Sequence, residues 1–256
     1  MVKSFHPNTA KYLHIQHIPF WHAFCNKRGI NHNTKELYMK RFIGLILLIL
    51  LCSAGLTARE LVFGVKGGVN LGWFSGNNWD DYVESAELYY GIDIEEQLHP
   101  ALHAGLYLES MFSQNLGFVT ELNFTQYGQD YEYSYAGEDF EGSYSINAIE
   151  IPLQLKIASQ PVGGFYGLAG PTIILLTGDL EFEESGGGVT VEGSDTPDNP
   201  IVLGLTAGVG YGFIMNQGVL SLEVRYGRNL TDAFDADKDP FDVNGFKLLL
   251  GYGFVL

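Results

Sequence analysis

Apolar side chains alternate with polar or glycine residues along much of the chain from residue 60 onward. In the segment 245–256, every second residue from Phe246 to Leu256 is apolar, whereas Lys247, Gly251 and Gly253 lie on the opposite face. A period of two is typical of a β-strand with one apolar face, because successive side chains of a strand point to opposite sides. No stretch after Ala58 shows a sustained helical period, so we expect an all-β chain.

Eight segments show this alternation, and they are the strands that we expect: about 60–73, 101–112, 116–128, 144–158, 164–178, 201–214, 219–229 and 243–255. Three of the connections are short, at 113–115, 159–163 and 216–218, and the other four are long. Short turns at one end and long loops at the other are typical of transmembrane β-barrels. The pattern predicts an eight-stranded antiparallel up-and-down transmembrane β-barrel with short periplasmic turns and long acidic extracellular loops.

The two faces of the predicted strands differ in a way that indicates which one meets lipid. One face is uncharged and rich in Leu, Ile, Val, Phe and Tyr, whereas the other collects glycine and isolated ions. A barrel of eight strands is filled by its own side chains, and an unpaired charge inside it would be costly. We therefore predict a structural network of paired charges in the lumen, formed by Lys66, Glu109, Glu121, Glu150, Lys156, Glu223, Arg225 and Lys247.

Glycine is more frequent than usual, with 32 residues among 256, or about 12.5% against the ~7% of average proteins. We expect much of this excess on the inner face, where glycine relieves crowding and allows the strands to coil.

Acidic residues concentrate in the four long connections. Of the 30 acidic residues, 24 lie in 74–100, 129–143, 179–200 and 230–242, where Lys238 is the only base. We interpret these runs as solvated loop faces. An alternative is that divalent cations bridge them to anionic lipid headgroups, which Asp235-Ala-Asp237-Lys-Asp239 suggests. The spacing does not fit a calcium-binding EF-hand loop, because Pro240 and Phe246 stand where Gly and Glu are required. The net charge of −16 argues against nucleic acid as a partner.

The region before residue 59 has the features of a secretory signal. Lys40 and Arg41 precede an apolar run, 42–51, and small residues lead up to Ala58. We predict that 39–58 is a signal peptide, that 1–38 is a misassigned upstream start or an extension, and that 59–256 is the barrel domain. Cleavage removes both cysteines, Cys25 and Cys52, and seven basic residues with one acidic residue. The remaining 7 bases and 29 acids give a net charge of −22.

Five motifs also carry a resemblance to a known family. They are Gly64-Val-Lys-Gly-Gly-Val-Asn-Leu71, Ile149-Glu-Ile-Pro-Leu-Gln-Leu-Lys156, Tyr166-Gly-Leu-Ala-Gly-Pro171, Leu220-Ser-Leu-Glu-Val-Arg-Tyr226 and Leu250-Gly-Tyr-Gly-Phe254. In their order and spacing, the chain resembles the PorT-like family of outer-membrane β-barrel domains over nearly all of 60–256. The resemblance implies an OmpA/OmpX-type barrel in the outer membrane of a diderm bacterium. Its partners would be outer-membrane lipids, the barrel-assembly machinery and secretion-system or surface proteins.

Three classes of function compete. We favour a non-enzymatic barrel with a structural, accessory or surface-interaction role, without a cofactor, catalytic residue or metal site. A lipid-modifying outer-membrane enzyme would need a base near a nucleophile at the outer rim, and His99 is the sole rim candidate. A secreted lipocalin-like binder of small molecules would need an apolar lumen, whereas the expected inner face carries eight ions.

Overall fold

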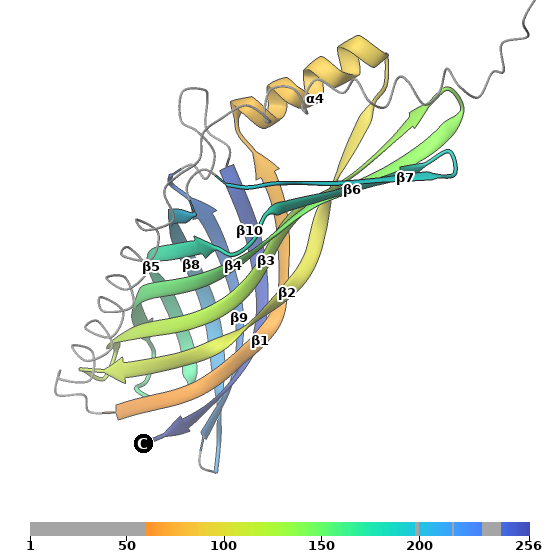
Figure 1. Cartoon of the computed structure of the whole chain (residues 1–256). Helices are drawn as coiled ribbons and strands as arrows, with labels where there is room; N and C mark the ends of the chain where they lie inside the picture. The colour runs from red at the N-terminus through yellow and green to blue at the C-terminus, as the bar shows by residue number, and fades with distance from the viewer. Residues whose placement is uncertain (1–59, 198–199, 217, 232–241) are drawn as a thin grey trace, which may run out of the picture. The chain divides into compact units, whose positions relative to one another are not determined.

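The computed structural model describes residues 60–256, except 198–199, 217 and 232–241. Within these residues the chain forms ten strands and one helix (Figure 1): β1 (Glu60–Ser75), α4 (Asn77–Tyr90), β2 (Ile94–Met111), β3 (Leu116–Tyr135), β4 (Glu138–Ala158), β5 (Gly164–Leu176), β6 (Leu180–Gly186), β7 (Val189–Asp195), β8 (Ile201–Met215), β9 (Gly218–Asn229) and β10 (Asp242–Val255). None of the described helical residues form a helix long and apolar enough to cross a membrane.

Eight of these strands close into a ring. Strands β1 to β5 and β8 to β10 each pair antiparallel with two neighbours in the ring. The first and last strands meet along their length, from Val62↔Val255 to Ser75↔Asp242. Each backbone amide in such a ring has a partner within the sheet, which a lipid environment requires. The predicted fold class, an eight-stranded antiparallel barrel, is confirmed, and the eight predicted segments correspond to these strands.

The exterior of the ring is apolar over a band of bilayer height. Leu248 is 49% exposed and Val224 is 46% exposed, although both lie in the middle of their strands. At the long-loop end, Trp73 packs against Phe246 and Tyr226, and at the short-turn end Phe165, Tyr211 and Phe213 form a second aromatic cluster. Ten residues separate Phe63 from Trp73 on β1, which corresponds to about 33 Å of strand. At a tilt of about 40° the band is about 25 Å tall, as in outer-membrane barrels.

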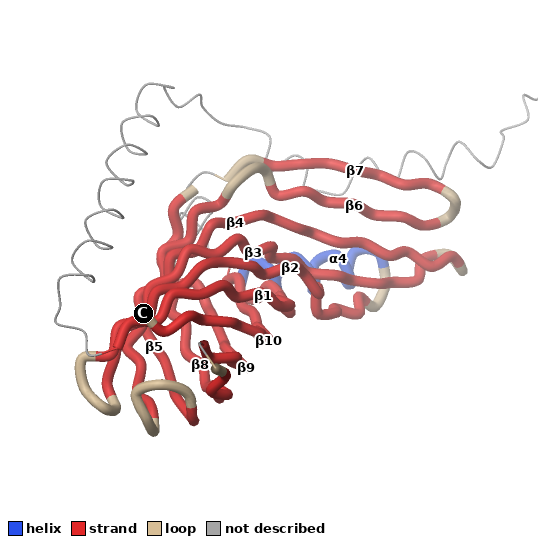
Figure 2. The backbone as a smooth tube through the Cα atoms, turned by 90° about the horizontal axis from the view of Figure 1, so that it is seen from below, coloured by secondary structure: helices blue, strands red, loops and turns tan. Residues whose placement is uncertain are grey.

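Parts of three of the predicted loops are folded into a sheet that continues beyond the ring, and one of them contributes the start of β2, from Ile94 to Leu98. Strands β3 and β4 remain paired out to Tyr135↔Glu138, and the hairpin β6–β7 adds to the outer half of β4. Figure 2 shows β6 and β7 beside β4 at the margin of this sheet. The prediction that 129–143, 179–200 and the end of 74–100 are simple loops is therefore wrong. Acidic residues alternate there with Tyr131, Tyr133 and Phe182. These segments therefore do have the period of two that is typical of a strand, although they are highly acidic.

The helix α4 was not expected from the sequence. It begins after Gly76 and ends at Gly91, which adopts a left-handed conformation and donates its amide hydrogen bond to the carbonyl of Glu87. Trp79 and Val83, four residues apart, lie on one face of the helix and pack against the aromatic core of the sheet. The helix thus depends on tertiary packing, and its short apolar stripe is too sparse to stand out in an acidic segment.

Candidate functional site

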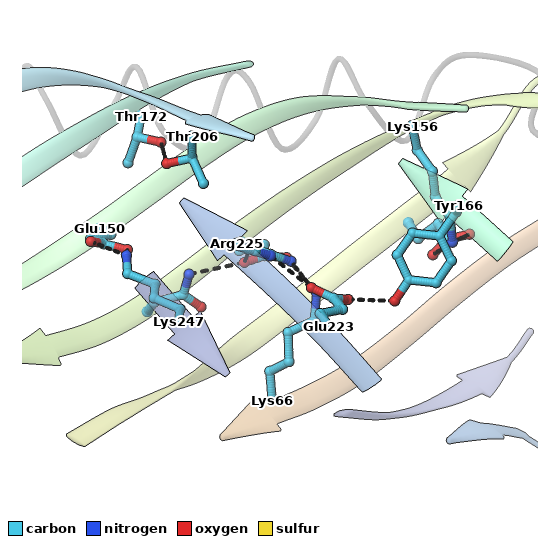
Figure 3. A network of polar contacts seen from close by, with 12 residues as sticks. Lys66, Glu150, Lys156, Tyr166, Thr172, Thr206, Glu223, Arg225 and Lys247 are labelled. Atoms are coloured by element: carbon cyan, nitrogen blue, oxygen red, sulfur yellow. Dashed lines mark hydrogen bonds and ion pairs between the residues drawn. The ribbon is translucent and has the colours of Figure 1, made fainter. Parts of the chain in front are cut away.

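The interior of the ring holds all eight charged residues of the predicted network. Each side chain points inward and no residue is more than 8% exposed. The structure does not join them in one network, but divides them into a central group of four and two flanking pairs (Figure 3).

The central group alternates positive and negative charge across the lumen. Arg225 donates two hydrogen bonds to the Glu121 carboxylate, at 2.7 and 2.8 Å, and its Nε donates a third to Glu223 at 2.7 Å. Lys66 Nζ lies 2.7 Å from Glu121 and 2.8 Å from Glu223. Each carboxylate therefore contacts both cations, and the group is neutral overall. Such a closed arrangement compensates the desolvation of four buried charges.

The flanking pairs lie toward opposite ends of the ring. Lys247 Nζ contacts both carboxylate oxygens of Glu150, at 2.5 and 2.6 Å, on the side of the long loops. Lys156 Nζ contacts both oxygens of Glu109, at 2.7 and 2.6 Å, near the short turns. The three groups thus fill successive levels of the lumen.

Three tyrosines support the ions, and sequence reasoning did not single them out. The hydroxyl of Tyr166 donates to Glu223 at 2.7 Å, and that of Tyr127 donates to Glu150. Lys156 Nζ lies 4.0 Å from the centre of the Tyr166 ring, and Lys66 Nζ lies 4.6 Å from that of Tyr107. The signal that could have found them is strand parity, since Tyr107 shares the inward parity of Glu109, and Tyr127 that of Glu121.

Glycines opposite these tyrosines provide the space for their rings. An ideal Cβ on Gly210 would lie 2.5 Å from Cζ of Tyr166, and one on Gly64 would lie 2.5 Å from Cε1 of Tyr107. Both distances are far inside van der Waals contact. The glycine content of the inner face is therefore linked to the aromatic residues that fill it.

Replacement of Gly210 by alanine is expected to destabilise the barrel by about 1–3 kcal/mol, because the added methyl group must displace Tyr166 from its contact with Glu223. The matched control is Gly167→Ala, since a Cβ at Gly167 meets only Gly208 O, at 3.8 Å. Urea unfolding of both variants in detergent, followed by tryptophan fluorescence, measures the difference. Equal stability of the two variants would contradict the packing role of Gly210.

An aromatic core closes the lumen at the long-loop end. It includes Phe74, Trp79, Tyr131 and Tyr144, and Trp79 also donates a hydrogen bond to Glu96 on β2. Trp79 packs edge-on against both Phe74 and Tyr144, with ring centres 5.5 and 5.7 Å apart. At the other end, a cavity of about 20 Å³ lies beside Tyr107 and Lys156. That space holds about one water molecule.

The rim histidine lies outside this network. Its Nδ1 lies 2.7 Å from Oδ1 of Asp130, and within the described residues His99 has no hydrogen bond to a hydroxyl group. Among these residues, no group of three or more His, Cys, Asp or Glu side chains is placed to hold a metal ion. The loop segment Asp235–Asp239, considered as a cation-bridging run, lies outside the described residues.

An apolar exterior with aromatic girdles, combined with a polar lumen that is filled by side chains, defines a class: the small transmembrane β-barrels. The comparison with known families places the chain within this class. It belongs to the family of the outer membrane protein beta-barrel domain, whose model matches residues 53–235. The protein is therefore located in a bacterial outer membrane.

Solved structures of outer-membrane proteins are similar to the chain at low identity. OprG from Pseudomonas aeruginosa is 14% identical, with a TM-score of 0.45, over 77% of this chain and 97% of that one. The attachment invasion locus protein Ail of Yersinia pestis is 14% identical, with a TM-score of 0.38, over 76% and 99%. Neisserial surface protein A is 15% identical, with a TM-score of 0.35, over 75% and 96%. No curated protein matches the sequence significantly.

Proposed function

We propose that this protein is a non-enzymatic, PorT-like barrel that anchors a surface-interaction module in the outer membrane. The single observation that carries the proposal is the filled lumen. Three neutral groups of ions occupy it, and Trp79 and its aromatic neighbours close one end. We expect a lumen packed in this way to leave little space for solutes. Among the described residues, the sheet and helix beyond the ring are then the parts most available to other molecules. An accessory role in secretion is the finer form of this proposal, and it rests on the PorT-like motifs.

The first test of this proposal is conductance across a planar bilayer. The purified protein is expected to give small openings or none, because the lumen is filled. A shift in gel mobility between unboiled and boiled samples shows that the same preparation is folded. Large and stable openings from a folded sample would contradict the proposal, and recovery of the protein in the soluble periplasm would favour a lipocalin-like binder instead.

The processing of the chain also stays a proposal. We infer that 59–256 is the mature domain, that 39–58 is a signal peptide and that 1–38 is an upstream extension or a misassigned start. Residues 1–59 lie outside the described part of the chain. We further propose that the barrel-assembly machinery inserts the domain, and that divalent cations bridge the acidic loops to lipid headgroups. Sequencing the N-terminus of the protein from isolated outer membranes tests the cleavage site.

A further inference from the structure

The sheet beyond the ring ends in a strand with one open edge. Strands β2, β3, β4, β6 and β7 follow one another there, and β7 pairs only with β6 among the described strands. The pairing of β6 with β7 is continuous over seven residue pairs, from Gly186↔Val189 to Leu180↔Asp195. The strand β7, with the sequence VTVEGSD, contains no proline, lysine or bulge, which are common means of protecting an edge.

The turn of this hairpin fixes which backbone groups face the open edge. Gly187 and Gly188 form a two-residue turn with φ values of 56° and 79°, the conformation of a type I′ hairpin. The pair that closes such a turn exchanges two hydrogen bonds, so Val189 and every second residue after it bond to β6. The amides and carbonyls of Thr190, Glu192 and Ser194 consequently point away from the sheet.

The side chains of β7 divide into an acidic polar face and an apolar face. Thr190, Glu192 and Ser194 are exposed on one face, whereas Val189 and Val191 are half-buried on the other. Glu192 lies directly opposite Glu183 of β6, and like charges in that position are destabilising. Over the same face lies an open hollow of about 460 Å³, lined by serines together with Glu181, Glu183 and Glu192. A cation placed beside Glu192 would relieve the repulsion.

We propose that the open edge of β7 binds an extended, basic polypeptide segment of another protein, which adds to the sheet as a further strand. The inference rests on the proposed surface-interaction function and specifies its partner. A strand added at this edge places alternate side chains next to Glu192 and next to Val191. The segment therefore alternates Lys or Arg with apolar residues, and its backbone bonds to Thr190, Glu192 and Ser194. A second copy of β7 is a poorer partner, because its own Glu192 would be brought to an acidic edge.

The experiment uses the full chain folded in detergent micelles and a fluorescent ten-residue peptide that alternates lysine with valine. Fluorescence anisotropy is expected to show saturable binding. The variant Thr190→Pro/Ser194→Pro removes two outward amide donors without a change of charge, and should weaken binding at least tenfold. The matched control Thr190→Ala/Ser194→Ala retains both donors and should remain within twofold of the original protein.

A second probe separates strand addition from attraction by charge alone. The same peptide with an N-methyl group on every residue keeps its lysines but has no amide donor left for the ladder on either edge, so it should bind at least tenfold more weakly. Equal binding of both peptides, or no effect of the proline variant, would overturn the proposal. So would the absence of saturable binding, or a β7-dependent dimer that forms without peptide. The gel-mobility shift of each variant reports on the barrel separately, so failure of the edge and failure of the barrel are distinguishable.

Discussion

Replacement of Arg225 by methionine is expected to lower the free energy of unfolding by about 3–5 kcal/mol, the usual effect of removing one partner from a buried ionic group. Arg225 donates hydrogen bonds to Glu121 and Glu223, and its removal leaves Lys66 as the one cation that contacts these carboxylates among the described residues. Methionine keeps much of the volume of the arginine side chain, so the expected loss of stability comes from the loss of the charge. The urea midpoint of the protein in detergent, followed by gel mobility, measures the loss.

The compensating variant for this prediction is Arg225→Met combined with Glu121→Gln. It restores neutrality and leaves Lys66 paired with Glu223, which lies 2.8 Å from it. We expect this double variant to be more stable than the single variant. A loss of less than about 1 kcal/mol in Arg225→Met, or no recovery in the double variant, would show that the central group is not a coupled unit.

A charge on the lipid-facing surface should have an effect that depends on its depth. Leu248→Arg is expected to cost about 2–4 kcal/mol, because Leu248 lies near the middle of the apolar band, opposite Val69 and Val224. Phe254→Arg, on the same strand and face but at the short-turn end, should cost no more than about 1 kcal/mol from its charge. Leu248 and Phe254 are 49% and 50% exposed, so the two sites are matched in burial within the protein.

The measurement is the unfolding free energy of both variants in lipid vesicles, with Leu248→Ala and Phe254→Ala as references for the lost side chains. The same substitutions in a protein whose outer surface met water would cost little at either depth. Equal costs at Leu248 and Phe254 would therefore contradict the assignment of the bilayer to this band.

The strands of the barrel could be predicted because each depends on a local pattern. A strand that separates lipid from a polar lumen must alternate apolar and polar side chains. On β10, for example, Leu248 faces the lipid and Lys247 faces the lumen. Whether a residue is at an odd or an even position along its strand also predicts whether its side chain faces the lumen or the lipid. It does not predict which ions meet, because that depends on the stagger and tilt of strands around the ring. Thus Lys156 of β4 contacts Glu109 of β2, on the far side of β3, although the two residues are 47 positions apart in the sequence.

The parts outside the membrane could not be predicted in the same way. The hairpin β6–β7 and the outer half of β4 have no lipid on either side, so their outward positions carry Glu and Ser where the barrel carries Leu and Val. In the helix α4, Trp79 packs against Phe74 at the end of the preceding strand and against Tyr144, which lies on β4 and is distant in the sequence. A contact with a residue that is distant in the sequence cannot be predicted from a local pattern. In the sequence, the helix is visible only as a few aromatic residues in an acidic segment.

The continuity of β3 and β4 through the rim has a mechanical consequence. The 20 and 21 residues of these strands form one ribbon, about 66 Å long, from the short-turn end to Tyr135 and Glu138. Its pairing is missing only between Thr120↔Leu153 and Asn123↔Glu150, and its register does not shift. We expect a pull on the outer tip to load the barrel wall through many hydrogen bonds, because no register shift separates the outer part of the ribbon from the part in the ring. We therefore expect the outer sheet to pass a load from a bound molecule to the barrel wall and not to move independently of it.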